Sequence, residues 1–362
     1  MKRMEFGYNK LGGSIPPSWA NFSKLTNLSL SFNNISGSIP SLAGMWPNLL
    51  EFDIAVNNIS GTIPEELYQV AKLDSLILNN NRLQGSLSES IGNLGLLRGS
   101  IDVSYNRLDG TIPKALASLS AVTSIYLDSN LFSGALPCEL AAMSLKELNI
   151  SMNNFDTTLP ECYLDSTSNI VILYATYANL TGPLPEPFAM SSKLTTLALS
   201  GNPTEGTLPG AWGSATNLVN LEMDKMELSG TIPLSYNRSF SSFSVIGNHL
   251  TGEIPRGMFG MGNFYFNGNI GLTGCYKWYY SASSRSLYCQ AYNTSLCCIS
   301  SGYCCKGIPD CPDYKACYLP PTTPSPLSPS PLPVTEDAAP EISGPAVLVA
   351  SLAALSIFMT MY

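Results

Sequence analysis

The chain has 362 residues, of which 45% are hydrophobic and only 12% charged, and it contains 29 glycines, 26 prolines, 10 cysteines and one histidine. Its 18 basic and 26 acidic residues give a net charge of −8, which lacks the basic excess that nucleic-acid binding requires. The apolar fraction is too high for a disordered chain, and this much glycine and proline is atypical of a helical enzyme.

The N-terminus starts directly in repeat sequence, because Met4, Phe6 and Asn9 already fit the pattern described next. Neither an apolar signal-peptide core nor a polar cap precedes that first repeat. A cytosolic start is one interpretation. We expect instead that the N-terminal end is incomplete, since features further along the chain are typical of exported proteins.

A repeat of about 24 residues occupies residues 1–274. Its marker, Gly-x-Ile/Leu-Pro and close variants, recurs eleven times in phase between Gly13–Pro16 and Gly252–Pro255. The segments between markers follow L-x-x-L-x-L-x-x-N-x-L, for example at Leu73, Leu76, Leu78, Asn81 and Leu83. This is the leucine-rich repeat pattern.

Each spacing in the repeat has a physical role. The two apolar residues of L-x-L point to one face of a short strand, and one coil cannot bury that face alone, so successive coils must stack. Glycine supplies unusual backbone angles at the turn, and proline fixes φ where the convex side begins. We therefore predict an α/β-type solenoid, a leucine-rich repeat horseshoe with short parallel strands on its concave face, followed by a disulfide-rich cap.

An asparagine column marks the point where the chain leaves each strand, because a buried amide can pair with backbone groups that the turn leaves free. Ala178 and Met226 interrupt this column, so we expect the two coils that contain them to be looser. The column comprises Asn9, Asn33, Asn57, Asn81, Asn106, Asn130, Asn153, Asn202, Asn248 and Asn269.

The whole frame, L-x-x-L-x-L-x-x-N-x-L-x-G-x-I-P, resembles the plant-type leucine-rich repeat of receptor-like proteins, receptor kinases and polygalacturonase inhibitors. The segment Gly268–Cys275 is similar to the G-N-x-G-L-C-G ending of such ectodomains, with Thr273 in place of their cysteine.

Residues 275–318 form the expected cysteine-rich cap. The cluster is even-numbered and includes two adjacent pairs, which indicates disulfides that close the open end of the core, although the pairing stays undetermined. A zinc site is the alternative, but C-x-x-C spacings are missing and the only histidine, His249, lies in a turn of the last coils. The clustered cysteines are Cys275, Cys289, Cys297, Cys298, Cys304, Cys305, Cys311 and Cys317.

Two further cysteines, Cys138 and Cys162, lie one coil apart at nearly equivalent positions. Stacking of the coils can bring them within bridging distance, so we expect a fifth disulfide; two free thiols are the alternative.

Residues 319–343 are a stalk rich in Pro, Ser and Thr, which favours extended polyproline geometry and O-glycosylation. Residues 344–362 form an uncharged hydrophobic tail with the layout of a glycosylphosphatidylinositol (GPI) attachment signal, with Asp337 or Ser343 as candidate attachment residues. A short transmembrane helix is the alternative.

The complete layout of repeats with Trp after the marker proline, a cysteine-rich cap, a stalk and an apolar tail resembles the trypanosomatid surface-antigen leucine-rich repeat proteins. That resemblance implies a lipid-anchored protein on the extracellular side of the plasma membrane. Sequons for N-glycosylation agree with export, although the repeat itself generates some of them. They lie at Asn21, Asn27, Asn34, Asn58, Asn149, Asn179, Asn237 and Asn293.

The sequence contains no catalytic pattern. His249 has no nucleophile motif nearby, and Gly257–Gly262 lacks the spacing of a dinucleotide-binding loop. We expect no enzyme activity, no cofactor and no metal.

The x residues of L-x-L-x-x face the concave side, where solenoids usually bind their partners. Tyrosines gather there in the middle coils and an acidic pair follows further along, whereas neighbouring coils carry small residues. The expected ligand-binding residues are Tyr105, Tyr126, Asp128, Met152, Tyr174, Tyr177, Glu222 and Asp224. These features predict a non-catalytic cell-surface recognition or adhesion protein that binds an extracellular protein or glycan. The alternative is a receptor-like or enzyme-inhibitor module of the plant type.

Overall fold

The computed structural model describes residues 1–41, 46–187, 189–238, 240–255, 258, 263–276, 289–290 and 295–298. The chain divides into two units, Met1–Tyr318 and Leu319–Tyr362, and all described residues belong to the first. The expected stalk, the hydrophobic tail, Asp337, Ser343 and Asn293 lie outside the described residues, as do four of the clustered cysteines, Cys304, Cys305, Cys311 and Cys317.

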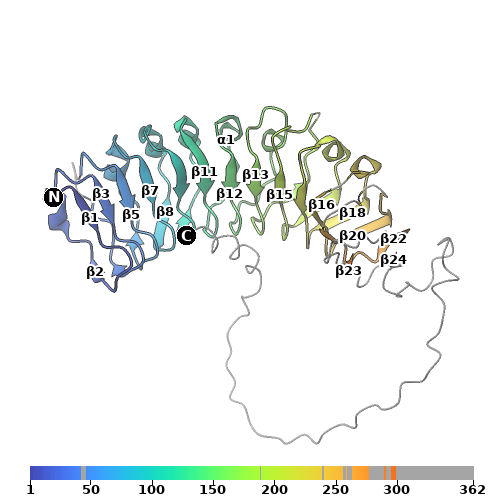
Figure 1. Cartoon of the computed structure of the whole chain (residues 1–362), viewed down its shortest axis with the longest axis horizontal. Coiled ribbons are helices and arrows are strands. Elements are labelled where there is room, and N and C mark those ends of the chain that lie inside the picture. Colours follow the sequence, from blue (N-terminus) through green and yellow to red (C-terminus); the bar gives the residue numbers. More distant parts are fainter. Residues whose placement is uncertain are drawn as a thin grey trace, which may run out of the picture. The chain divides into compact units, whose positions relative to one another are not determined.

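A sheet of thirteen parallel strands, one strand from each coil, lines one side of the stacked coils (Figure 1). Neighbouring strands pair in register, so Met4 lies beside Leu28, Leu28 beside Phe52, and so on along the stack. In order, the strands are β1 (Arg3–Glu5), β3 (Asn27–Ser29), β5 (Glu51–Asp53), β7 (Ser75–Ile77), β9 (Gly99–Asp102), β11 (Val122–Tyr126), β12 (Glu147–Asn149), β13 (Ile172–Tyr174), β15 (Thr196–Ala198), β17 (Asn220–Glu222), β19 (Ser242–Ser244), β21 (Asn263–Tyr265) and β23 (Cys289–Gln290). The predicted leucine-rich repeat solenoid is confirmed.

Short strands after the asparagine turn form additional parallel sheets. Their turns depend on the marker glycines, which have positive φ as expected, for example +79° at Gly37. β23 and β24 continue both kinds of sheet beyond residue 274, into the segment for which a cap was expected. These strands are β2 (Gly12–Ser14) with β4 (Asn34–Ser36); β6 (Ser60–Gly61) with β8 (Arg82–Ser86) and β10 (Arg107–Asp109); and β14 (Gly182–Pro183), β16 (Thr204–Thr207), β18 (Glu227–Thr231), β20 (His249–Glu253), β22 (Gly271–Tyr276) and β24 (Ser295–Cys298).

The opposite side of the coils is built mostly from 3-10 turns rather than α-helices. Most begin after the marker proline, whose φ near −65° suits a helical start, and a coil of about 24 residues leaves room for roughly one turn there. They are η1 (Pro17–Asn21), η2 (Glu65–Gln69), η3 (Glu89–Asn93), η4 (Lys114–Ser118), η5 (Glu161–Tyr163), η6 (Gly210–Ser214) and η7 (Leu234–Tyr236), with one α-helical turn, α1 (Glu139–Ala142).

The core runs along the whole stack between the two sides. The repeat leucines are fully buried, and so are the two tryptophans Trp46 and Trp212. Each tryptophan also donates its indole N–H to a carbonyl of the preceding coil: Trp46 to Trp19 at 2.9 Å and Trp212 to Pro185 at 3.0 Å. Each coil therefore obtains both apolar and polar contacts from its neighbour.

The asparagine column forms the predicted ladder. The Asn153 amide donates to three carbonyls at 3.0–3.1 Å, and its Oδ1 accepts from the Phe132 N–H at 3.0 Å in the preceding coil. At Ala178, where the column is interrupted, the backbone closes the contact instead: the Phe155 N–H donates to the Ala178 carbonyl at 3.0 Å. Ala178 is fully buried there.

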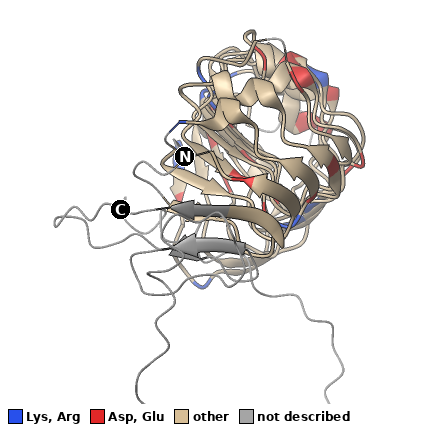
Figure 2. Cartoon of the chain, turned by 90° about the vertical axis from the view of Figure 1, so that its right-hand side faces the viewer, with Lys and Arg blue, Asp and Glu red and all other residues tan. Residues whose placement is uncertain are grey.

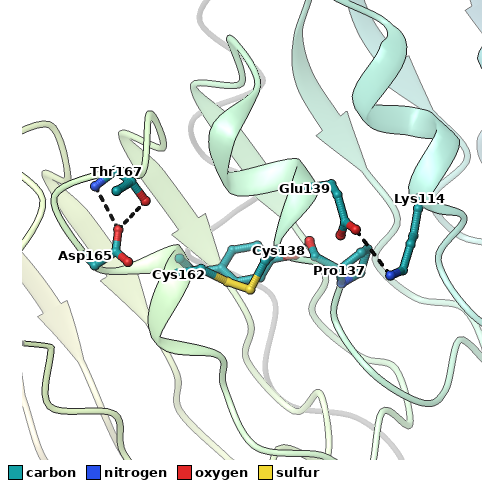
Figure 3. The surroundings of a disulfide bond; sticks show 8 residues. Lys114, Pro137, Cys138, Glu139, Cys162, Asp165 and Thr167 are labelled. Atoms are coloured by element: carbon teal, nitrogen blue, oxygen red, sulfur yellow. Dashed lines mark hydrogen bonds and ion pairs between the residues drawn. A yellow bond between two sulfur atoms is a disulfide. The ribbon is translucent and has the colours of Figure 1, made fainter.

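The predicted disulfide between Cys138 and Cys162 is present, with the two Cα atoms 5.7 Å apart (Figure 3). It joins the residue before α1 to η5 in the next coil, beside a bond of 2.9 Å from the Tyr163 hydroxyl to the Pro137 carbonyl. Among the described residues, no helix has the length and apolarity to cross a membrane.

Candidate functional site

The surface of the main sheet is organised in four side-chain columns. In each coil the first two columns are the outward residues of the strand. The third and fourth columns are the two residues that directly precede the asparagine position. In the coil of β11 they are Ser124, Tyr126, Asp128 and Ser129. Because the strands pair in register, equivalent residues of successive coils lie side by side along each column.

The fourth column has a left-handed backbone throughout. At its non-glycine residues φ lies between +51° and +57°, even at Val56 and at aromatic residues, where the left-handed region costs roughly 1–2 kcal/mol per residue. The asparagine amide that follows binds the carbonyls around this bend and holds it. This geometry projects large side chains outward from a rigid sheet.

Five of the fourth-column side chains are large and exposed, with exposed fractions from 42% to 78%. Tyr8 and Phe32 lie on the first two coils, and Tyr105, Met152 and Tyr177 lie on the central coils. The rings of Tyr8 and Phe32 stack with centroids 4.4 Å apart. Sequence analysis missed these two residues, although they occupy the same repeat position as Tyr105 and Tyr177.

Six of the predicted ligand-binding residues come together on four successive strands, β9 to β13. We call this set the central patch: Tyr105, Tyr126, Asp128, Met152, Tyr174 and Tyr177. The other two predicted residues, Glu222 and Asp224, lie on the coil of β17, two coils beyond β13. Between them, β15 presents the small residues Ala198, Ser200 and Gly201.

Tyr177 covers that small-residue coil. A Cβ atom at Gly201, which has a φ of +75°, would lie only 2.4 Å from the Tyr177 ring. The ring therefore depends on this glycine for its position over the neighbouring coil.

The central patch holds carboxyl groups with perturbed acidity. Burial raises the pKa of Asp128 to about 6, and the adjacent Asp102 carboxylate adds to the increase. Burial also raises the pKa of Asp102, although the Ser104 hydroxyl and N–H both donate to it, at 2.7 and 3.0 Å. Asp128 has only 9% of its surface exposed, and the contacts that lower its pKa, a backbone hydrogen bond at Asp128 itself and the Ser129 hydroxyl at 3.5 Å, do not offset burial.

Tyr126 is fixed by a carboxylate in the next coil. Its hydroxyl donates to Glu147 at 3.0 Å, and burial together with that negative charge raises the pKa of Tyr126 to about 12. Sequence analysis did not single out Asp102 or Glu147, yet the same outward positions of L-x-L would have located both.

The acidic pair on the coil of β17 is also perturbed. Burial raises the pKa of Glu222, with Asp224 as the second cause. Burial likewise raises the pKa of Asp224, which accepts from the Ser244 hydroxyl at 2.5 Å and the Ile246 N–H at 2.7 Å.

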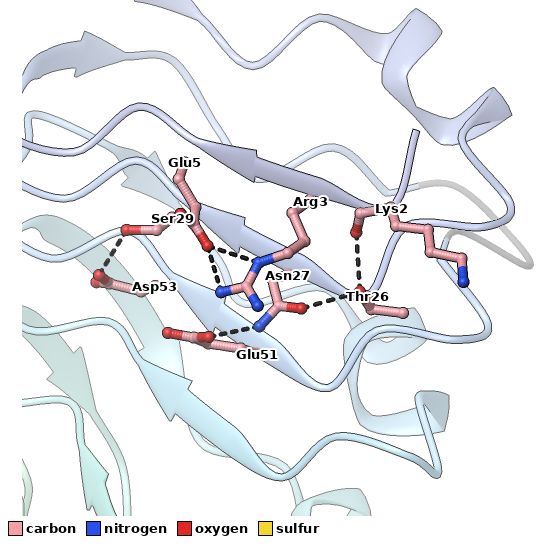
Figure 4. A network of polar contacts seen from close by, with 8 residues as sticks. All are labelled: Lys2, Arg3, Glu5, Thr26, Asn27, Ser29, Glu51 and Asp53. Atoms are coloured by element: carbon pink, nitrogen blue, oxygen red, sulfur yellow. Dashed lines mark hydrogen bonds and ion pairs between the residues drawn. The ribbon is translucent and has the colours of Figure 1, made fainter.

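The carboxylates of the N-terminal coils also have close partners, and one of these is a basic side chain (Figure 4). Arg3 donates to Glu5 at 2.7 Å, the Asn27 amide to Glu51 at 2.6 Å, and the Ser29 hydroxyl to Asp53 at 3.0 Å.

Over the twelve strands β1 to β21 the four columns carry eight carboxylates and two basic residues, a net charge of −6. Figure 2 marks the acidic residues of the chain in red and the basic residues in blue. The carboxylates are Glu5, Glu51, Asp53, Asp102, Asp128, Glu147, Glu222 and Asp224, and the basic residues are Arg3 and Lys225. The concave columns therefore account for most of the net charge of the chain.

The sequons fall on three parts of the surface. Asn27 and Asn149 lie on the main sheet, Asn34, Asn58 and Asn179 follow the asparagine turn, and Asn21 and Asn237 adjoin the convex 3-10 turns. Within the described part of the chain, no group of three or more His, Cys, Asp and Glu residues could hold a metal ion. His249 pairs with Glu227 at 3.0 Å on an exposed surface.

Family models described as leucine-rich repeat match residues 23–83 and 144–164. A search of curated proteins found no match.

Solved structures of plant receptors are similar to this chain. The Arabidopsis receptor kinase HAESA, solved with the peptide hormone IDA and the co-receptor SERK1, is 27% identical over 75% of this chain and 42% of that chain, with a TM-score of 0.57. The ectodomain of GASSHO1/SCHENGEN3 from Arabidopsis thaliana, solved with CASPARIAN STRIP INTEGRITY FACTOR 2, is 25% identical over 82% and 42%, with a TM-score of 0.61.

A plant ice-binding protein shares the fold at 20% identity, covering 75% of this chain and 81% of that chain, with a TM-score of 0.54. The chain spans about half the length or less of the receptors it matches. The repeat pattern of the sequence, the register of the strands and the similarity to solved structures all indicate the same fold. The protein is a leucine-rich repeat solenoid that resembles the ectodomains of plant leucine-rich repeat receptors.

Proposed function

We propose that this protein is a non-catalytic recognition module that binds an extracellular protein or peptide through the central patch. The main observation in support is that the side chains of Tyr105, Met152 and Tyr177 are exposed and lie beside half-buried tyrosines on consecutive coils. Large apolar side chains on a rigid surface are typical of binding sites, and tyrosine is favoured among the residues that dominate binding energy. The left-handed backbone fixes them in this outward position without a flexible loop.

The receptor structures support a peptide or protein ligand over a glycan. HAESA was solved with a peptide hormone, and it has the same kind of parallel solenoid as this chain. This similarity also supports the second candidate, a receptor-like or inhibitor-like module of the plant type. The two candidates share the same concave surface and differ in what the protein does after binding.

We further propose that the protein acts outside the cell, attached to the membrane by a lipid anchor. The Cys138–Cys162 disulfide supports an oxidising compartment, and the composition of residues 319–362 supports a stalk followed by an attachment signal. Release of the full-length protein from expressing cells by phosphatidylinositol-specific phospholipase C is the expected result. Retention on the cells after treatment would contradict the anchor.

Photo-crosslinking tests the binding surface directly. A photoreactive phenylalanine derivative is placed at Tyr105 in one version of the protein and at Leu234 in another; Leu234 is 84% exposed on the convex turn η7. After incubation with extracellular fluid of the source organism, the probe at residue 105 should form a discrete crosslinked species that the probe at 234 does not. Crosslinking from residue 234 alone would place the binding surface on the convex side.

A further inference from the structure

The concave columns carry eight carboxylates and only two basic side chains, and this excess of negative charge suggests the chemistry of the ligand. In the N-terminal coils Glu5 pairs with the basic side chain of Arg3, whereas Glu51 and Asp53 accept from neutral donors. In the central patch, Asp128 is nine-tenths buried, lies next to the like-charged Asp102, and forms no ion pair with any described residue. A positive group supplied from outside would offset this local excess of negative charge.

The surroundings of these carboxylates also suit a cationic side chain. Tyr126 and Tyr174 are half-buried in the second column, on either side of Asn149, and an aromatic face attracts a guanidinium or ammonium group. Because the Tyr126 hydroxyl donates to Glu147, the ring and the carboxylate are held beside each other. Acid and aromatic groups thus form one fixed surface.

A second acidic position lies at a defined distance along the sheet. The coil of β17, with Glu222 and Asp224, is four strands beyond β11, which corresponds to about 19 Å at 4.8 Å per strand. An extended peptide advances about 3.3 Å per residue, so about six residues separate groups placed over the two positions. On the intervening coil Ala198 is buried and the Tyr177 ring lies over Gly201, so the peptide would cross the sheet above these residues.

We infer that the ligand is a basic peptide that crosses strands β9 to β17 in an extended conformation, with two cationic side chains about six residues apart. One contacts the carboxylates of Asp102, Asp128 and Glu147, and the other contacts Glu222 and Asp224. This inference rests on the proposed function, since it uses the same concave surface.

Selection from a phage-displayed library of random dodecapeptides against the immobilised full chain tests the inference. Selected peptides are expected to carry two Lys or Arg residues separated by five to seven positions. Replacing either basic residue by citrulline or norleucine in a synthetic copy should weaken binding about tenfold or more, which is the loss expected for one charge-assisted contact.

Protein variants locate the contact. Asp102→Asn with Asp128→Asn, and separately Glu222→Gln with Asp224→Asn, should each weaken binding of the selected peptides by a similar factor. The matched control is Glu65→Gln with Glu161→Gln, which removes the same charge from the exposed convex turns η2 and η5 and should change the Kd less than twofold. Circular dichroism confirms that each variant is folded.

The outcomes separate the two proposals. Neutral or acidic selected peptides whose binding is lost with Tyr105→Ser and Tyr177→Ser overturn the basic-ligand inference and leave the concave binding surface standing. Two results count against the proposed function itself. One is that neither the acidic nor the tyrosine substitutions change the binding of the selected peptides, and the other is that the selection enriches no peptide. An equal loss with the convex control shows that net charge alone drives the association and also overturns the inference.

Discussion

Replacement of Asp128 by asparagine should stabilise the fold at neutral pH. Only 9% of the surface of Asp128 is exposed, the residue lies close to Asp102, and among the described side chains only the Ser129 hydroxyl donates to its carboxyl group, at 3.5 Å. Asparagine has nearly the same shape and carries no charge. The substitution therefore removes the cost of burying a carboxylate without opening a cavity.

The size of this stabilisation and its dependence on pH follow from the pKa of Asp128 in the folded protein. Burial and the Asp102 charge raise the pKa of Asp128 from 3.8 to about 6, so the folded protein binds this proton more tightly than the unfolded chain. Each unit of difference corresponds to about 1.4 kcal/mol, so the ionised form destabilises the fold by about 3 kcal/mol above pH 7. As pH falls through 6 toward 4 this destabilisation decreases, to about 1 kcal/mol at pH 4.5 and almost nothing below the unfolded pKa.

Urea denaturation of the wild type and the Asp128→Asn variant at pH 7.5 and 4.5 measures the effect. The stability difference between the two proteins should be about 3 kcal/mol in favour of the variant at pH 7.5 and about 1 kcal/mol at pH 4.5. Because both proteins share every other titrating group, the comparison isolates residue 128. A variant that is equally or less stable at pH 7.5, or a difference that does not change with pH, would refute the argument that this carboxylate is buried and uncompensated.

Three further predictions concern the framework around the site. Cys138→Ser with Cys162→Ser should lower stability by about 3 kcal/mol, as expected for a loop of this length, and dithiothreitol should lower the thermal midpoint of the wild type but leave the variant unchanged. Asn153→Ala should cost about 2–4 kcal/mol in urea denaturation, because buried carbonyl and N–H groups lose their amide partner; a cost below 1 kcal/mol would contradict the ladder. Gly201→Ala should displace the Tyr177 ring and weaken peptide binding, and nuclear magnetic resonance signals of Tyr177 that stay unchanged would show that its ring does not lie over residue 201.

Much of the fold could be predicted because one local pattern repeats. The spacing of Leu76, Leu78 and Asn81 specifies a strand and the turn after it, and the 24-residue period places the next copy alongside. The same reasoning paired Cys138 with Cys162, since an offset of one period between equivalent residues becomes a contact between adjacent coils. The central patch followed from the outward positions of L-x-L, which is why its tyrosines were found together.

Other features depended on contacts that no repeat pattern contains. The interruption at Ala178 was expected to loosen its coil, but the backbone carbonyl of that residue accepts the hydrogen bond that an amide would otherwise supply. The repeat pattern did not specify the conformation of the convex side, and the short coil gives it mainly 3-10 turns. The stack of Tyr8 on Phe32 likewise requires the two side chains to be brought within 4.4 Å of each other by the strand register.

By itself, the sequence determined the solenoid, its turn residues and its disulfide between coils, because each follows from a period and a one-coil neighbour relationship. Only the tertiary structure decided which outward residues are exposed and which are buried. Tyr105 and Asp128 are both outward positions of the repeat, yet one is half exposed and the other almost covered. The physical reason is that exposure and acidity depend on the side chains of the coils on either side, which differ from one repeat to the next.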